Sequence, residues 1–216
     1  MNINKLAFRN FKTLENVSFE PGRVNVFIGA NGSGKTTVLE AIGLLCAAMT
    51  IGLCGGRLAE AIEEIIRKDE DGESYLQDLP LDDVLELIDW ACGFDVASPK
   101  KSSVNAAVPT SRRILEFQDR YLTSKTSFTA YDASEGALYV LFLLCLALHP
   151  DAPGIFAVDS FDHSMHPRLA RETTRLFCKT ILEQDKTVFV TTHNPLVLDG
   201  LDLMDDGTLA IKPISE

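Results

Sequence analysis

A glycine-rich segment at residues 29–36 has the residue types and the spacing of a phosphate-binding loop. Its sequence, Gly-Ala-Asn-Gly-Ser-Gly-Lys-Thr, fits the pattern G-x-x-x-x-G-K-[ST]. Glycines let several backbone N–H groups face one point, and a helix that starts there adds its partial positive charge. We expect Lys35 to contact the β- and γ-phosphates of ATP, Thr36 to contact Mg²⁺, and Thr37 to contact the α-phosphate. The residues expected to bind ATP are Asn31, Gly32, Ser33, Gly34, Lys35, Thr36 and Thr37.

The segments that flank this loop are those that a phosphate loop needs. The apolar run at 24–28 predicts a buried strand, and apolar residues at three- and four-residue steps predict a helix over 36–49. Alternating side chains at 3–8 and 17–19 predict an antiparallel hairpin that leads into the strand. The strand–loop–helix order makes a chance match to the pattern a poor explanation of the glycines and the lysine.

Three further sites in the second half of the chain carry groups that suit phosphate chemistry. Ser134 and Gly136 open an apolar helix over 138–148, which is either a second anion-binding helix N-terminus or an ordinary helix cap. A predicted strand over 154–159 ends in Asp159, a carboxylate suited to a Mg²⁺ site that it would share with Thr36. Another predicted strand, 187–193, ends in His193, which is expected to reach a γ-phosphate. Strands that alternate with helices predict an α/β fold with its ligand at the carboxyl ends of the strands.

Other segments follow from the same periodic patterns. A helix is predicted over 167–183, and two amphipathic helices are predicted over 58–66 and 81–88. We expect a strand over 114–117 to return to the core sheet and residues 208–212 to add a last edge strand.

Composition limits the class of protein. The chain has 216 residues, 46% of them apolar, which suits a single domain, 1–216, with an acidic helical insert and loop over 52–110. The formal charge of −11 lies in residues 60–95, and the charges of the remaining chain balance. This acidic face is either solvated or a docking surface for a basic partner, and it does not indicate a nucleic-acid partner. No signal peptide or membrane span is expected, so the predicted location is cytoplasmic.

Taken together, the motifs resemble the head domain of an ABC-type AAA ATPase of the RecF, SMC and overcoming-lysogenization-defect branch. The resemblance covers residues 1–50 and 130–200: 6–12 is similar to the first strand and turn, 29–36 to the Walker A loop, 133–137 to the signature motif, and 191–195 to the histidine switch. Asp159 closes a strand similar to Walker B, and the His166-Pro167 step resembles the D-loop of short bacterial members. The family fold is that of a P-loop NTPase, with a mixed sheet flanked by helices.

The resemblance implies an ATPase that uses Mg²⁺ and pairs head to tail as a homodimer. In that arrangement Ser134 and Gly136 of one subunit close over the γ-phosphate held by Lys35 of the other. Many short members of the family accompany antiphage systems, so the implied partner is an effector such as a nuclease. A P-loop kinase would share the Walker A loop but would have no use for a signature helix or for His193.

The chain departs from the family pattern at the catalytic position. The residue after the Walker B aspartate is usually a glutamate that polarises the attacking water, and here it is Ser160. Loss of general-base assistance typically costs about 10²- to 10⁴-fold in rate. Either Asp162 or His193 substitutes for the glutamate, or the protein is a nucleotide-gated scaffold that hydrolyses ATP very slowly or not at all.

Two other family features are harder to place. Gln77 and Gln118 are the candidates for the glutamine that usually contacts the Mg²⁺ site, and no heptad arms separate the two halves of the head. His163 and His166, beside Asp159 and Asp162, form an alternative transition-metal pattern, which we rank below Mg²⁺ with nucleotide.

Overall fold

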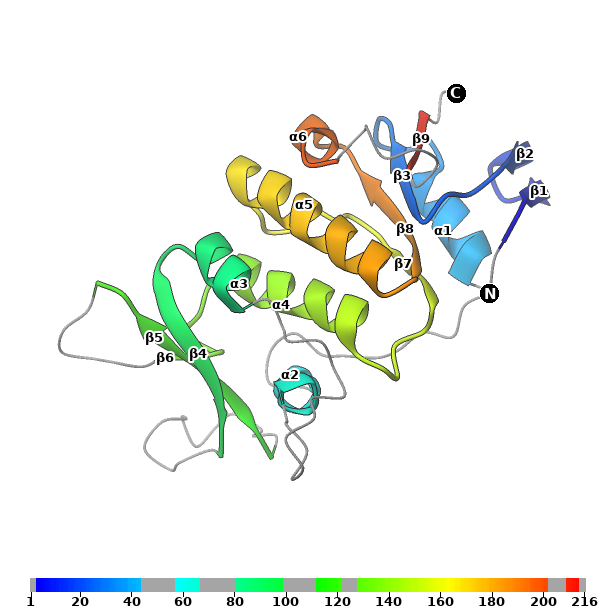
Figure 1. The fold of residues 1–216 in the computed structure, drawn as a ribbon. Coiled ribbons are helices and arrows are strands. Elements are labelled where there is room, and N and C mark those ends of the chain that lie inside the picture. The colour runs from blue at the N-terminus through cyan, green and yellow to red at the C-terminus, as the bar shows by residue number, and fades with distance from the viewer. Residues whose placement is uncertain are drawn as a thin grey trace. The chain divides into compact units, whose positions relative to one another are not determined.

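The computed structural model describes residues 3–43, 57–66, 81–98, 112–121, 128–201 and 209–213. The chain forms two compact units (Figure 1). The first consists of Met1–Met49 and Pro153–Glu216, and the second of Thr50–Ala152. The predicted insert, 52–110, lies within the second unit, which also contains the helix that Ser134 opens.

The first unit is built on a parallel sheet. Its strands are β3 (Val24–Ile28), β7 (Ile155–Val158), β8 (Thr187–Thr192) and β9 (Leu209–Pro213), in the order β7-β8-β3-β9. All three pairings within this sheet are parallel, so the carboxyl ends of its strands lie at one edge. The predicted strands over 24–28, 154–159 and 187–193 are confirmed, and the predicted last edge strand is β9.

A hairpin precedes the phosphate-loop strand, as the alternating side chains predict. Strand β1 (Leu6–Phe11) pairs antiparallel with β2 (Leu14–Phe19). The apolar side of the hairpin joins one buried cluster with β3 and the helix after the loop. Within that cluster the Phe27 ring stacks on Phe189, with centroids 6.4 Å apart, and meets Phe19 edge to face at 5.5 Å. These aromatic contacts hold the strand that carries the loop.

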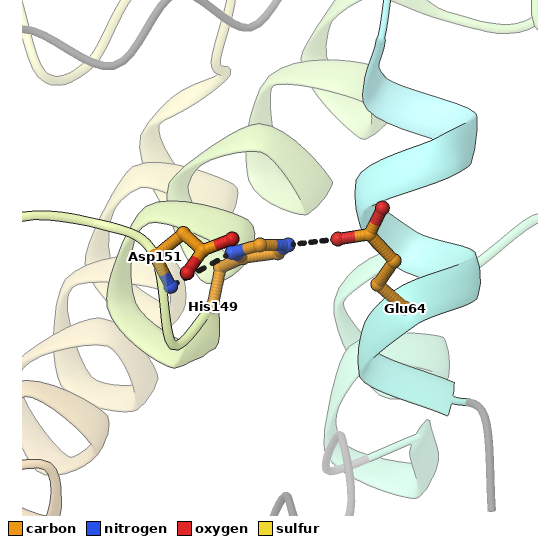
Figure 2. A group of neighbouring side chains, drawn as sticks. All are labelled: Glu64, His149 and Asp151. Atoms are coloured by element: carbon orange, nitrogen blue, oxygen red, sulfur yellow. Dashed lines mark hydrogen bonds and ion pairs between the residues drawn. The ribbon is translucent and has the colours of Figure 1, made fainter.

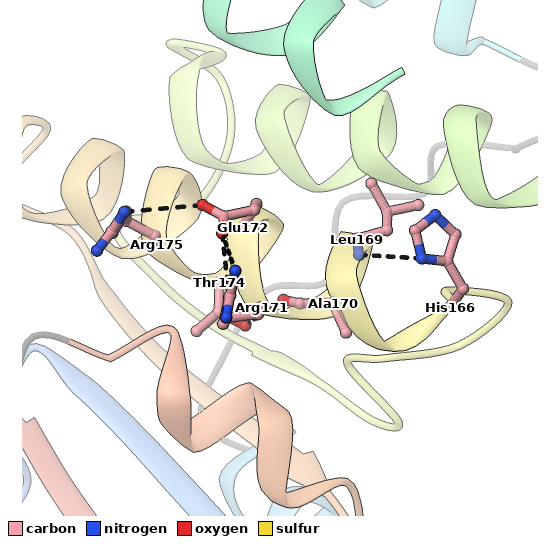
Figure 3. Close-up of polar contacts among 7 residues, drawn as sticks. All are labelled: His166, Leu169, Ala170, Arg171, Glu172, Thr174 and Arg175. Carbon is pink, nitrogen blue, oxygen red and sulfur yellow. Dashed lines mark hydrogen bonds and ion pairs between the residues drawn. The ribbon is translucent and has the colours of Figure 1, made fainter. Parts of the chain in front are cut away.

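Among the described residues, the helices of the first unit are α1 (Lys35–Gly43), α5 (Pro167–Glu183) and α6 (Pro195–Asp199). The helix predicted over 36–49 is α1 as far as Gly43, and the rest of that range lies outside the described residues. Helix α5 has the predicted bounds, and its first turn is capped by His166, whose Nδ1 accepts from the Leu169 N–H at 3.3 Å (Figure 3). On its exposed side, Glu172 pairs with Arg171 and with Arg175.

The second unit contains α2 (Leu58–Ile66), α3 (Leu81–Leu87), α4 (Glu135–Leu148), and an antiparallel sheet of β4 (Ala91–Ala97), β5 (Ile114–Asp119) and β6 (Phe128–Thr129). Helices α2 and α3 lie where apolar periodicity predicts helices. The prediction that 114–117 returns to the core sheet is wrong, because β5 pairs with β4 and β6. Phe117 explains the pairing: it is fully buried and packs on Trp90 and Phe94, which flank and occupy β4.

The predicted fold class is confirmed. The chain is an α/β protein with parallel and antiparallel sheets and helices, and the two strand arrangements occur in separate sheets. Across the part of the chain that the structure describes, every helix is too short or too polar to cross a bilayer.

We predict that Phe27→Ala destabilises the first unit by about 3–5 kcal/mol, because it removes a buried ring from the aromatic stack and leaves a cavity. Phe8→Ala is the matched control, since Phe8 is only partly buried and lies at the margin of the same cluster. Urea unfolding followed by circular dichroism measures both. Equal losses for the two variants would contradict the central place given to Phe27.

Candidate functional site

A cavity of about 250 Å³ lies at the carboxyl edge of the parallel sheet. Its lining residues are Thr13, Asn31, Gly32, Gly34, Lys35, Thr36, Thr37, Asp159, Ser160, Thr191 and His193. They come from the β1–β2 turn, the glycine-rich loop, the start of α1, and the segments that follow β7 and end β8. Typical pockets for whole ligands occupy about 300–1,000 Å³, so this cavity suits the phosphate end of a nucleotide.

Glycine is needed in the loop at two positions. Gly32 and Gly34 have φ angles of +86° and +89°, a region that favours residues without a Cβ atom. At Gly34 a Cβ atom would also lie 3.3 Å from the Thr13 hydroxyl. Any side chain there would therefore be strained and would crowd the turn of the hairpin.

Lys35 is almost buried and its ammonium group is held by the loop itself. The side-chain nitrogen donates to the carbonyl oxygens of Gly29, at 2.8 Å, and Ala30, at 2.6 Å. An ammonium has three N–H donors, so these two bonds leave one for an anion in the cavity. The Ser33 hydroxyl oxygen is buried and has no hydrogen-bond partner among the described residues. Together with the N–H groups that open α1, these donors fit a bound phosphate.

Thr36 and Asp159 meet as the sequence predicts for a shared metal site. The Thr36 hydroxyl donates to one carboxylate oxygen of Asp159 at 3.2 Å and lies 3.5 Å from the other. Mg²⁺ prefers hard oxygen ligands at 2.0–2.1 Å in an octahedron, in which neighbouring ligands are ~3 Å apart. The donor atoms and their spacing therefore fit Mg²⁺ bound to a nucleotide.

Ser160 occupies the position at which the resemblance implies a catalytic glutamate, and its backbone is unusual. Its φ angle is +55°, in the left-handed region that few residues other than glycine adopt. Its N–H donates to the Thr191 hydroxyl at 2.9 Å, and the residue lines the cavity. A short hydroxyl side chain thus stands where a general base is expected.

The two substitutes for that base differ in their surroundings. His193 is exposed and lines the cavity. Asp162 does not line it, and its carboxylate accepts a hydrogen bond of 2.7 Å from the Thr192 hydroxyl. Of the two, only His193 borders the space assigned to the phosphates.

Ser134 and Gly136 lie at the start of α4, in the second unit. The exposed Ser134 is the N-cap, and its hydroxyl oxygen accepts from the Ala137 N–H at 3.3 Å. Ser134 therefore acts as a helix cap, as one of the two interpretations of the sequence predicts. The predicted contact with a second subunit's nucleotide stays a prediction. Gln118 lies on β5 in the same unit, and Gln77 lies outside the described residues.

Two cavity residues were missed by the sequence analysis. Thr13 comes from the hairpin turn, and its hydroxyl donates to Thr37 at 3.4 Å. Thr191 ends β8, and its hydroxyl donates to Asp159. The only signal for Thr191 was its position beside Thr192 and His193 at the end of a predicted strand.

The alternative transition-metal pattern is not supported. Among the described residues, the only group of three ligand atoms within 4.8 Å of one another comes from Glu64, His149 and Asp151 (Figure 2). There the Asp151 N–H donates to His149 Nδ1 at 3.2 Å, so Nε2 carries the proton and donates to Glu64 at 2.9 Å. Both nitrogens of the His149 ring already make hydrogen bonds. We therefore interpret this group as a structural contact between α2 and the end of α4. His166 caps α5 instead of gathering with His163.

Comparison with curated proteins finds similarity to ATP-binding and DNA-repair proteins. The chain is 24% identical over 185 residues to the lipoprotein-releasing system ATP-binding protein LolD of Neorickettsia sennetsu, a match that covers 85% of this chain and 79% of LolD. It is 60% identical over 38 residues to the DNA replication and repair protein RecF of Heliobacterium modesticaldum. That second match covers 18% of this chain and 10% of RecF.

Comparison with solved structures supports the fold. The SMC head domain from Thermotoga maritima superposes with a TM-score of 0.56 at 12% identity, over 100% of this chain and 95% of that chain. At this identity the likeness concerns the fold alone. It agrees with the α/β arrangement of the parallel sheet and its helices.

Family models match both halves of the chain. A model described as an AAA domain matches residues 5–79, which include the glycine-rich loop. A second, described as "AAA domain, putative AbiEii toxin, Type IV TA system", matches residues 53–199, which include Ser134, Asp159 and His193. Because the second model covers more than half of the chain, the chain belongs to the AAA-domain family of that description.

Proposed function

We propose that this protein binds ATP with Mg²⁺ and hydrolyses it slowly. The observation that carries the proposal is the meeting of Lys35, Thr36 and Asp159 around one cavity beside a loop with two left-handed glycines. Asp159 lies 123 residues after Thr36 in the chain, and each of the three residues has the chemistry that a triphosphate and its cation require.

Each residue has a distinct role in the proposed reaction. Lys35 and the N–H groups at the start of α1 bind phosphate oxygens and offset charge that develops in the transition state. Thr36 and Asp159 hold Mg²⁺, which when bound supplies further charge neutralisation between the phosphates. His193, at the rim of the cavity, hydrogen-bonds to the γ-phosphate or to the attacking water.

The proposed turnover is slow because a carboxylate is missing from the catalytic position. Asp159 is the only acid among the described residues that line the cavity, and it is engaged by Thr36 and Thr191. Asp162 is bound to Thr192 and lies outside the lining. The same observation favours the second candidate function, a scaffold that binds ATP and scarcely hydrolyses it.

We further propose that ATP drives head-to-tail pairing of two copies, with Ser134 and Gly136 of one facing the γ-phosphate of the other. Paired heads would gate an effector partner, such as a nuclease in an antiphage system. The family description refers to a putative toxin of a type IV toxin–antitoxin system, which supports a role beside a second protein. The exposed position of Ser134 supports the pairing.

We predict that Lys35→Ala lowers steady-state phosphate release by about 100-fold or more, because it removes a charged donor to the transferred phosphate. Lys12→Ala is the control: Lys12 is also near the loop, but it is exposed and pairs with Glu40. Release is measured with a coupled phosphate assay. Unchanged release by the Lys35 variant would remove the proposed activity.

We predict that Ser160→Glu raises turnover by up to about 10²- to 10⁴-fold, because it supplies the missing general base. Ser164→Glu makes the same change of charge at another left-handed residue, one outside the cavity lining, and is expected to leave the rate unchanged. Single-turnover hydrolysis measures both. If Ser160→Glu gives no gain, another group already acts as base.

We predict that a non-hydrolysable ATP analogue with Mg²⁺ converts the protein from monomer to dimer, and that Ser134→Asp prevents this. Aspartate keeps the helix cap but places a negative charge against the γ-phosphate of the other subunit. Ser134→Thr keeps both the cap and the hydroxyl and is expected to dimerise. Light scattering after size exclusion gives the mass, and a Ser134→Asp dimer would argue against the proposed interface.

A further inference from the structure

Side-chain hydroxyl groups at the end of β8 donate hydrogen bonds to the segment that follows β7. Thr191 and Thr192 are both nearly inaccessible to solvent. The Thr191 hydroxyl donates to Asp159, and the Thr192 hydroxyl donates to Asp162 at 2.7 Å. The Thr191 carbonyl oxygen also accepts from the Phe161 N–H at 2.9 Å.

The direction of the Thr191 hydrogen bond is fixed by its second partner. The Ser160 N–H can only donate, and it donates to the Thr191 oxygen at 2.9 Å. The single hydroxyl proton of Thr191 is therefore directed at the Asp159 carboxylate. That leaves Asp159 with one oxygen toward Thr191 and the other toward Thr36.

The hydrogen bonds of Thr191 fix both the Asp159 side chain and the Ser160 backbone in the proposed site. The Asp159 carboxylate is exposed, so without a partner its side chain would sample several rotamers. Ser160 holds an unfavourable left-handed backbone, and the hydrogen bond that its N–H donates to the Thr191 hydroxyl helps to stabilise it. One hydroxyl thus orients the metal-binding carboxylate and the backbone of the residue at the catalytic position.

We propose that Thr191 is a positioning residue that holds the Asp159 carboxylate in the orientation that binds Mg²⁺ with the nucleotide. The inference rests on the proposed ATP-binding function and adds to it a residue that touches neither phosphate nor reacting water in that proposal. Thr191 acts through Asp159. Loss of such outer partners typically lowers metal affinity about 10- to 100-fold.

The test compares thermal unfolding with a non-hydrolysable ATP analogue in EDTA and across a Mg²⁺ titration. In Thr191→Val, which removes the hydroxyl and keeps the branched shape, we expect the concentration of Mg²⁺ for half-maximal stabilisation to rise about 10- to 100-fold. The stabilisation by the analogue in EDTA is expected to stay at the wild-type value. Thr191→Ser, which keeps the donor, is expected to restore the Mg²⁺ response.

Thr187→Val is the matched control, because Thr187 is a buried threonine at the opposite end of the same strand. We expect it to keep the wild-type Mg²⁺ response. If the valine variant at 191 does not fold, Thr191→Cys, which has only a weak donor, is measured in the same way and is expected to show a raised Mg²⁺ requirement.

The outcomes separate this inference from the proposed function. A wild-type protein that gains no stability from the analogue under either condition overturns the proposed function. A wild-type protein that responds, together with a folded Thr191 variant of unchanged Mg²⁺ dependence, overturns only the role of Thr191. A variant that loses the EDTA and Mg²⁺ responses equally also overturns it, because the effect is then on nucleotide binding or on the fold as a whole.

Discussion

The Asp159 carboxylate is the point on which the organisation of the candidate site depends. One of its oxygens accepts from Thr36, at the start of α1, and the other accepts from Thr191, at the end of β8. Those bonds join the phosphate loop, the segment after β7 and the end of β8 at one place. The parallel sheet makes this meeting possible, because it brings the carboxyl ends of β3, β7 and β8 to the same edge.

Local pattern predicted the elements that carry strong chemical or periodic signals. The glycine-rich loop, the strand before it and the capped helix α5 all follow from short-range features, namely glycines, an apolar run and a proline after a cap. The sheet of the second unit did not follow, because β4 contains Gly93 and Asp95 and β5 has the same apolar character as a core strand. Which sheet such a strand joins depends on tertiary partners such as Trp90 and Phe94, which no local window encodes.

The candidate site likewise contains residues that local pattern predicts and residues that it does not. Lys35, Thr36 and Asp159 were predictable because a phosphate and its cation demand those groups at fixed points in a strand–loop–helix order. Thr191 and Thr13 were not, since a threonine at the end of a strand or in a turn is common and its partner lies far away in the sequence. Asp162 was a reasonable candidate base by sequence, and only its bond to Thr192 and its position outside the lining distinguish it from His193.

The strand that carries the phosphate loop lies between two strands from the far end of the chain. Val24 is paired with Val188 on one side and with Leu209 on the other. Contacts between such distant segments close late and slowly, because the loop that they close is long. During synthesis the glycine-rich loop therefore emerges well before the strands that support it. A ribosome that stops early would release a chain with an intact phosphate-loop sequence and no stable place to hold ATP.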